Sequence, residues 1–349
     1  MKKCWEVSWR RFLHPSQIET KGSSEILETE TAAKICDGIV DDVARVYVGD
    51  RLLLKKLLAA ALANGHVLFE DYPGLGKTLL VKAFAKVIGC GYKRIQFTPD
   101  LLPADIIGTR IWRQSDGSFE LMKGPVFTNI LLADEINRAP PKTQSALLEA
   151  MEEKQVSIEG ETHVLGSPFV VLATQNPIEL EGTYPLPEAQ MDRFMLRLST
   201  GYAKSLEDEN SILERRIAWR SDDPTPDIAP YTSSEEFSAI QDLVESGIYV
   251  DKSIIEYINK IVRSTREHPQ VEVGSSPRGG LVLLRISRAL TLMNRRDFVT
   301  PDDVKLVVKD ALSHRIILKV EYALEGVHPD EIVEEIVKEI PAPIEFHPR

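Results

Sequence analysis

The chain has 349 residues, of which 43% are apolar and 27% charged. These are ordinary values for a folded protein of about two domains, and they exclude a fibrous or wholly disordered chain. The net charge of −11 disfavours a nucleic-acid coat protein, which would need a basic surface. Cys4, Cys36 and Cys90 stand far apart and form no C-x-x-C pair, so neither a disulfide framework nor a zinc knuckle is predicted.

The N-terminal part gives no sign of a membrane or export segment. No apolar run approaches the roughly 18 residues that cross a bilayer, and charged residues with Pro15 interrupt the start of the chain. We therefore expect a cytoplasmic protein with reduced thiols and no membrane span. Residues 1–35 are mixed and polar, and Trp5, Trp9 and Phe12 give only a weak helical pattern, so this part is predicted to be a flexible extension.

Beyond this extension the pattern becomes helical and then changes near residue 66. From there short apolar runs alternate with longer periodic segments, which is typical of βαβ units with a mostly parallel sheet. Helices are predicted at 32–43, 51–63, 77–88 and 141–153, and strands at 67–69, 93–98, 130–133 and 169–174. Two segments interrupt the alternation, 108–124 and 155–165, and the turn residues at their centres predict two β-hairpin insertions.

After residue 204 the composition becomes helical, and three helix starts are recognisable from their capping residues Ser233, Ser253 and Thr300. The predicted class is therefore an α/β domain followed by a small all-helical domain. The predicted boundaries are 1–35 for the extension, 36–203 for the α/β domain, 204–320 for the helical domain and 321–349 for an acidic C-terminal tail. His66 and His314 are interpreted as structural or surface residues.

A glycine-rich loop between the first strand and the next helix carries the clearest chemical signal. Gly74 and Gly76 let the backbone curl so that N–H groups point at phosphate oxygens, and the helix N-terminus adds its dipole. Lys77 would reach the β- and γ-phosphates of a nucleotide, and Thr78 would ligate Mg²⁺. Asp71 stands where the strict pattern has glycine. The predicted nucleotide-binding residues are Asp71, Tyr72, Pro73, Gly74, Leu75, Gly76, Lys77, Thr78 and Leu79.

Polar residues follow two further predicted strands. Asp134 and Glu135 come directly after the apolar run 130–133, at the sheet edge where α/β proteins bind ligands. Asp134 would hold Mg²⁺, and Glu135 would orient and activate an attacking water. Asn176 follows the next strand, where its amide would hydrogen-bond the γ-phosphate or the water; a turn-forming Asn before proline is the alternative.

These motifs resemble those of the MoxR-type AAA+ ATPases over about residues 37–320. The segments that carry the resemblance are Glu70–Thr78, 132–153, Ala173–Pro177, Leu186–Phe194 and Ser276–Arg278. The resemblance implies a P-loop α/β domain with a helical lid, and it matches the two hairpins to the helix-2 and pre-sensor-1 insertions of that group. It also implies that Asp71 is a variant that leaves the phosphate loop functional.

The resemblance further implies roles for three polar residues. Asn176 is similar to the sensor 1 residue, Arg193 to the arginine finger that reaches the ATP of a neighbouring subunit, and Arg278 to the sensor 2 arginine of the lid. Each would place a donor near the γ-phosphate, where charge shifts in the transition state. The expected catalytic residues are then Glu135, Asn176, Arg193 and Arg278, and the expected metal ligands are Thr78 and Asp134.

The function that the resemblance implies is ATP hydrolysis with Mg²⁺ in a homo-oligomeric ring, expected to be a hexamer, that remodels or matures client proteins. Clients with von Willebrand factor A domains and the insertion of metals or cofactors belong to that expectation. A nucleic-acid-translocating motor is the alternative, since related AAA+ rings with both insertions unwind DNA. The hairpin tips at 115–117 and 159–161 carry acidic residues, which repel phosphates and disfavour the motor. Glu135 and Arg193 together disfavour a non-hydrolysing scaffold.

Overall fold

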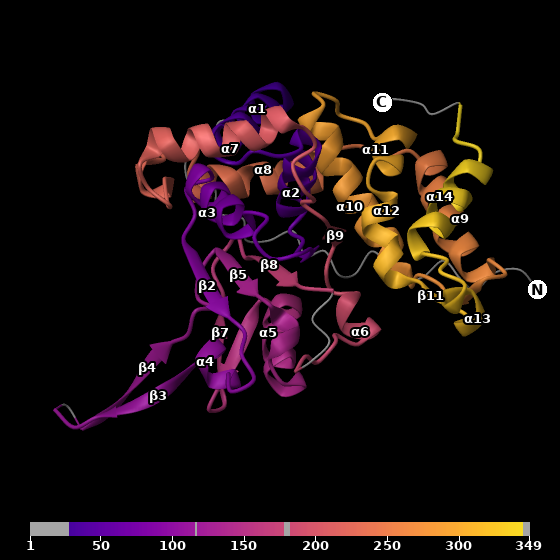
Figure 1. Ribbon diagram of the computed structural model, residues 1–349. Helices are drawn as coiled ribbons and strands as arrows, with labels where there is room; N and C mark the ends of the chain where they lie inside the picture. Colours follow the sequence, from indigo (N-terminus) through magenta and orange to yellow (C-terminus); the bar gives the residue numbers. More distant parts are fainter. Residues whose placement is uncertain (1–27, 116, 178–181, 345–349) are drawn as a thin grey trace, which may run out of the picture.

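A five-stranded parallel sheet lies at the centre of the computed structural model, which describes residues 28–115, 117–177 and 182–344 (Figure 1). The strands stand in the order β2-β5-β8-β1-β9, and every neighbouring pair is parallel. Their bounds are Val67–Glu70 for β1, Tyr92–Gln96 for β2, Ile130–Asp134 for β5, Val170–Gln175 for β8 and Leu196–Leu198 for β9. The predicted α/β class with a mostly parallel sheet is therefore confirmed.

The central strands supply two separate cores, because successive side chains of a strand point to opposite faces of the sheet. In β5, Ile130 and Leu132 pack into one core and Leu131 and Ala133 into the other. The first core contains the helices α1 (Thr29–Val46), α2 (Arg51–Leu62) and α3 (Lys77–Val87), and the second contains α5 (Pro141–Glu153). The short helix α4 (Pro103–Ile107) packs beside α5.

The start of α1 corrects the predicted extension. The helix begins at Thr29, and Ala32 and Ala33 are fully buried, so residues 29–35 belong to the α/β domain. Small apolar side chains let this turn pack closely, although the sequence around them is polar. Trp5, Trp9 and Phe12 lie outside the described residues.

Strand β9 was not predicted. It has only the three residues Leu196, Arg197 and Leu198, which are too few to display an alternating pattern. Its pairing with Val67–Phe69 of β1 defines it as a strand and adds the fifth member of the sheet. The short helix α6 (Glu188–Met191) precedes it.

The two predicted hairpins are present. Strands β3 (Gly108–Arg113) and β4 (Ser118–Lys123) form a long ribbon that projects from the lower left of the molecule in Figure 1. Strands β6 (Gln155–Ile158) and β7 (Glu161–Val164) form the shorter hairpin. An ion pair of 2.5 Å between Arg110 and Glu161 joins the two.

The second part of the chain is the helical lid, which confirms the predicted class. Its helices are α7 (Leu206–Trp219), α8 (Ser234–Gly247), α9 (Lys252–Glu267), α10 (Pro277–Met293), α11 (Pro301–Lys305), α12 (Val308–Leu312), α13 (Val320–Leu324) and α14 (Pro329–Glu339). A short antiparallel ladder of β10 (Val271–Val273) and β11 (Ile317–Leu318) is added to the helices. The sequence showed no sign of this ladder because both strands are very short.

Two of the three predicted helix starts are correct. The Ser233 hydroxyl caps α8 by accepting from the Glu236 N–H at 3.2 Å, and Thr300 with Asp303 forms a capping box at α11. Ser253 is wrong as a cap, because α9 begins at Lys252 and its cap is Asp251, whose carboxylate accepts from the Ser253 N–H at 2.8 Å. An Asp two residues upstream competes successfully for the same orphan backbone donors.

The predicted acidic tail at 321–349 is also corrected. Helices α13 and α14 lie within it, and Ile332, Val333 and Ile336 of α14 are almost completely buried in the first core. These three apolar residues have helical spacing, which the surrounding acidic residues obscured. The structure therefore places residues up to at least 339 in the lid.

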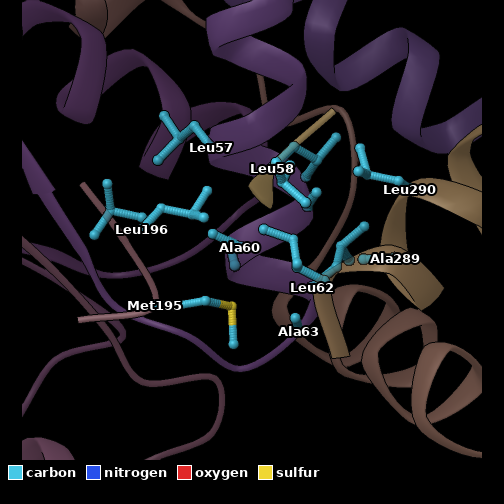
Figure 2. Close-up of a cluster of buried hydrophobic side chains, with 14 of the residues drawn as sticks. Leu57, Leu58, Ala60, Leu62, Ala63, Met195, Leu196, Ala289 and Leu290 are labelled. Carbon is cyan, nitrogen blue, oxygen red and sulfur yellow. The ribbon is translucent and has the colours of Figure 1, made fainter. Parts of the chain in front are cut away.

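Helix α2 joins the α/β domain to the lid. Figure 2 shows Leu58 and Leu62 of this helix beside Leu290 of α10, with Met195 lying near the opposite side of the cluster. One continuous core thus fixes the lid to the sheet, which positions the residues described below. Among the described residues, no helix is long and apolar enough to cross a membrane.

Candidate functional site

The predicted phosphate loop lies between β1 and α3, at the carboxyl end of the central strands. Gly74 and Gly76 have φ angles of 84° and 75°, the left-handed conformation that glycine adopts without strain. Gly76 is the residue before α3, so the loop leads directly into the N-terminus of that helix, where free backbone N–H groups suit a phosphate. A cavity of about 490 Å³ opens there and is lined by most of the predicted residues. They are Asp71, Pro73, Gly74, Leu75, Gly76, Lys77, Thr78, Leu79, Asp134, Glu135 and Asn176. We call this the phosphate cavity.

The side chain of Lys77 folds back onto the loop. Its Nζ donates to the carbonyl oxygens of Tyr72 at 2.7 Å and Asp71 at 3.4 Å. Burial lowers the pKa of Lys77, while the negative charges of Asp71, Asp134 and Glu135 oppose that shift. Carbonyl oxygens hold the ammonium without neutralising it, so its charge remains to attract phosphate.

The acidic pair is held by neighbouring strands. Asp134 accepts from Thr174 Oγ1 at 2.6 Å and from Arg94 Nη2 at 2.6 Å. The Glu135 backbone N–H donates to the same Thr174 hydroxyl oxygen at 2.8 Å. Thr174 therefore fixes the end of β5 to β8 and orients the Asp134 carboxylate.

Glu135 itself is in a strained and well-braced position. Its φ of 54° lies in the left-handed region, which is unfavourable for a residue with a side chain. Its Oε2 accepts from Gln96 Nε2 at 2.7 Å and from Arg138 Nε at 3.0 Å. Gln96 and Arg94 of β2 were missed from the sequence, because single polar residues on an edge strand have no distinctive spacing.

The geometry of Asp71 explains why this loop has no glycine there. Its buried carboxylate accepts from Ser199 Oγ at 2.6 Å and from the Thr200 N–H at 2.7 Å and hydroxyl at 2.9 Å. The side chain thus connects the phosphate loop to the segment after β9. Direct contact of Asp71 with a nucleotide stays a prediction, as does that of Tyr72, whose ring stacks on Tyr202 at 6.1 Å.

A second cavity of about 370 Å³ lies against the other side of the phosphate loop. It shares Gly74, Leu75, Gly76 and Leu79 with the phosphate cavity and adds aromatic and apolar side chains. These are Tyr47, Tyr202, Ile212 and Trp219. Their positions are widely separated in sequence, so no motif could have predicted them.

The two predicted arginines lie elsewhere, together, in a third cavity of about 450 Å³ that we call the arginine cavity. Arg193 Nη1 donates to the Leu148 carbonyl oxygen at 2.6 Å. Arg278, in the first turn of α10, pairs with Glu152 of α5. The structure therefore brings Arg278 next to Arg193 and separates both from the phosphate cavity of the same chain.

A buried residue of the lid holds the Arg193 segment. Arg315 donates to Asp192 Oδ1 at 2.7 Å and to the Phe194 carbonyl at 2.7 Å, and its side chain is 1% exposed. Burial lowers its pKa to about 10, and Asp192 opposes the shift. The other oxygen of Asp192 lies 3.4 Å from Ser276 Oγ, the cap of α10. Asp192 thus connects the segments that carry the two arginines.

The donor set of the phosphate cavity fits magnesium. Thr78 and Asp134 line it with a hydroxyl and a carboxylate, and Mg²⁺ takes one or two such oxygens together with phosphates and waters. Three or more His, Cys, Asp or Glu side chains that could chelate a metal by themselves do not gather anywhere in the described parts of the chain.

Comparison with known proteins agrees with this arrangement. Residues 66–196 match the ATPase family associated with various cellular activities (AAA), and residues 263–336 match the AAA lid domain. The chain is 40% identical to Chaperone MoxR1 of Mycobacterium tuberculosis over 338 residues, covering 94% of this chain and 87% of the relative. It is 47% identical to the uncharacterized protein YeaC of Bacillus subtilis over 306 residues, covering 88% and 94%.

A solved structure supports the same conclusion. The crystal structure of a Cytophaga hutchinsonii protein, whose proposed activity is that of an ATPase, superimposes with a TM-score of 0.83 at 41% identity. It covers 90% of this chain and 97% of its own. Together with the phosphate loop, the acidic pair and the lid, these relatives show that the chain belongs to the MoxR-type AAA+ ATPases, enzymes that hydrolyse ATP.

Proposed function

We propose that the protein couples Mg²⁺-dependent ATP hydrolysis to chaperone-like remodelling of client proteins, with each active site shared between two copies in a ring. The observation that carries this proposal is the separation of Arg193 and Arg278 from the phosphate cavity of their own chain. Arg94 does line that cavity, but its guanidinium is already paired with Asp134. A second copy that presents its arginine cavity would supply the missing cations.

In the shared site, residues of one copy would bind ATP and prepare water. Lys77 and the loop amides would hold the β- and γ-phosphates. Glu135 would act as the base that orients the attacking water. Bound Mg²⁺, held by Thr78 and Asp134, would neutralise phosphate charge. Asn176 would hydrogen-bond the γ-phosphate or the water from the end of β8.

The same copy would hold the nucleoside in the cavity behind the phosphate loop. Tyr47, Tyr202 and Trp219 give that cavity aromatic walls, and because it shares part of its lining with the phosphate loop, a base and ribose bound there would lie next to their phosphates. Burial raises the pKa of the Tyr47 phenol, so it stays a neutral donor at physiological pH.

The neighbouring copy would supply Arg193 and Arg278 to the γ-phosphate. Both arginines line the arginine cavity. Each one donates to an oxygen of its own chain, which it would exchange for phosphate oxygens. The two guanidinium groups would stabilise the negative charge that shifts among the phosphate oxygens in the transition state. A hexameric, cytoplasmic ring fits the proposal.

The proposed clients are proteins, including those with von Willebrand factor A domains that need maturation or metal insertion. The relative from Mycobacterium tuberculosis is named a chaperone, which supports this class of role. The projecting hairpin β3–β4 exposes an aromatic pair, Trp112 and Phe119, at 55% and 63% of their surface. Such rings suit contact with a client protein.

Mixing two inactive variants tests the shared site. Arg193→Ala removes the proposed cation in trans, and Glu135→Gln removes the proposed base in cis. In mixed assemblies some interfaces pair an intact Glu135 with an intact Arg193, so ATPase activity should return above that of either variant alone. A mixture that co-assembles by native mass spectrometry but stays inactive would contradict the proposal.

A further inference from the structure

Helix α7 carries an apolar stripe that is exposed among the described residues of its own chain. Leu206, Leu213 and Ile217 are 68%, 64% and 75% exposed, and their spacing of seven and four residues puts them on one side of the helix. Every residue of α7 is exposed or half-exposed. An exposed apolar stripe of this length is typical of a surface that contacts another protein.

The opposite side of α7 is fixed to the molecule. Arg215 Nη1 donates to the carbonyl oxygens of Ala44 at 2.9 Å and Arg45 at 2.8 Å, at the end of α1. Ile212 and Trp219 line the aromatic cavity behind the phosphate loop. The helix therefore stands beside the nucleotide site with its apolar stripe turned away from it.

The lid contains a groove of matching character. It lies between α9 and α10, encloses about 700 Å³ and has a mainly apolar floor that includes Ile258, Val262 and Leu284. Ile255 and Leu281 in its walls are 43% and 59% exposed. Helices α7 and α9 lie on opposite sides of the molecule in Figure 1, so a chain cannot fill its own groove with its own α7.

The groove adjoins the arginine cavity. Leu281 lines both, one turn of α10 after Arg278. If the arginine cavity of one copy faced the phosphate cavity of the next, the groove of the first copy would lie close to α7 of the second, because the cavity that α7 lines shares residues of the phosphate loop. The two apolar surfaces would then meet at the same boundary as the catalytic residues.

Charge also matches across this boundary. Glu207, Glu209 and Glu214 flank the stripe, and within the described part of the chain they form no ion pair. Two arginines stand at the groove: Arg263 pairs with Glu267 at 2.7 Å, while Arg266 donates to the Ser275 carbonyl at 2.7 Å, which does not neutralise its charge. The cations of α7 are already engaged, since Arg215 is bonded to α1 and Arg216 pairs with Asp222 at 2.6 Å.

We propose that α7 of one copy docks through Leu206, Leu213 and Ile217 into the α9–α10 groove of a second copy. The contact uses different surfaces on the two partners, which is the arrangement that builds rings. This inference rests on the proposed function, because it takes the facing of the two cavities from the shared site. It adds the apolar contact that would hold that site together.

Cross-linking locates the contact. In a Cys4→Ser background, where the remaining cysteines Cys36 and Cys90 are buried, Ile217→Cys and Leu281→Cys are made as two separate proteins and mixed. A short bismaleimide should yield a heterodimer at least tenfold faster than when Leu281→Cys is replaced by Leu324→Cys. Leu324 is 83% exposed on α13, outside the groove, and serves as the matched control. Equal rates for both mixtures would overturn the proposal.

Assembly gives the second measurement. Leu213→Asp with Ile217→Asp should raise the concentration of half-assembly at least tenfold in sedimentation velocity with ATP analogue and Mg²⁺. Val320→Asp with Leu324→Asp, which changes two exposed apolar residues of α13, should leave it unchanged. Equal assembly of both double variants would contradict the docking of α7.

These results separate this inference from the proposed function. If α7 is wrong but the shared site is right, the Arg193→Ala and Glu135→Gln mixture recovers activity while the cross-link rates stay equal. If the chain remains a monomer with ATP analogue and Mg²⁺, both the shared site and the α7 contact are overturned.

Discussion

The phosphate cavity and the arginine cavity differ in how their charges are arranged. In the phosphate cavity, carboxylates outnumber cations and pair with two of them, Arg94 with Asp134 at 2.6 Å and Lys82 with Asp223 at 2.7 Å, while Lys77 is held by backbone carbonyls. In the arginine cavity, cations outnumber acids, and two of the arginines donate to backbone carbonyls. Arg193 donates to Leu148 O at 2.6 Å and Arg285 to Ala63 O at 2.6 Å.

This difference explains why neither cavity would be sufficient alone. The phosphate cavity has more carboxylates than cations, which suits a metal ion that arrives with a phosphate chain. Arginines that donate to carbonyl oxygens keep their positive charge, because a carbonyl does not neutralise it. Burial lowers the pKa of one of them, Arg285. Such unneutralised cations are suited to meet a negative group from outside the chain. The predictions below test this division.

The largest expected effect is on the rate of hydrolysis. Arg193→Ala should lower kcat by roughly 10³-fold or more, the range found for arginine fingers in phosphoryl transfer, while ATP affinity changes little. Arg288→Ala is a matched control, because Arg288 pairs with Glu245 on the lid away from both cavities. Steady-state ATPase assays with calorimetric ATP binding make the measurement, and an equal loss of affinity and rate would place Arg193 in the cis site.

How far the sequence predicted these cavities depends on whether a residue belongs to a contiguous motif. The phosphate loop and the Asp134–Glu135 pair lie at the strand ends that the sequence predicted, because each is marked by its neighbours, while their chemical roles stay predictions. The placement of Arg278 beside Arg193 depends on how α10 packs on α2 and α5, which no local pattern records. Arg315 escaped notice for the same reason, since a lone arginine is normally a surface charge.

The next expected effect is on the stability of the fold and arises from Asp192, which connects the segments that carry Arg193 and Arg278. Asp192→Asn leaves the Arg315 charge buried with only neutral acceptors, which should destabilise the fold by roughly 3–4 kcal/mol, the low end for a broken buried pair. Asp330→Asn is the control, because its partner Arg197 also pairs with Glu70. Urea unfolding of both variants measures the difference, and equal stability would show that Asp192 is dispensable to Arg315.

A pH effect of similar size should arise from His66, which lines the arginine cavity. Burial lowers its pKa from 6.5 to about 4, and its Nδ1 accepts from the Val171 N–H at 2.9 Å, which a protonated ring could not do. The unfolded chain would bind a proton below pH 6.5 and the folded chain would not, so stability is lost as the pH falls toward 4. Complete loss corresponds to about 3 kcal/mol.

The measurement is urea unfolding between pH 7 and 4.5, for the parent and for His66→Gln. The variant should show a shallower decline, because its side chain does not titrate. His328→Gln, outside both cavities, should keep the parental slope. If the free energy of unfolding of His66→Gln fell with pH as steeply as that of the parent, the prediction would be contradicted. Either His66 would be charged in the folded protein, or other buried groups would cause the whole pH effect.

The smallest effect is on nucleotide affinity, and it sharpens the contrast with Arg193. Lys77 is held by the carbonyls of Asp71 and Tyr72 and would exchange them for phosphate oxygens, so Lys77→Ala removes one charge-assisted contact. ATP binding should weaken by about 1.5–3 kcal/mol, or roughly ten- to a hundredfold. Calorimetry on a variant whose unfolding midpoint is unchanged provides the measurement. Arg193→Ala, measured beside it, should keep its affinity. If both variants lost affinity equally, Arg193 would contribute to nucleotide binding as Lys77 does, and the division of labour between the two cavities would fail.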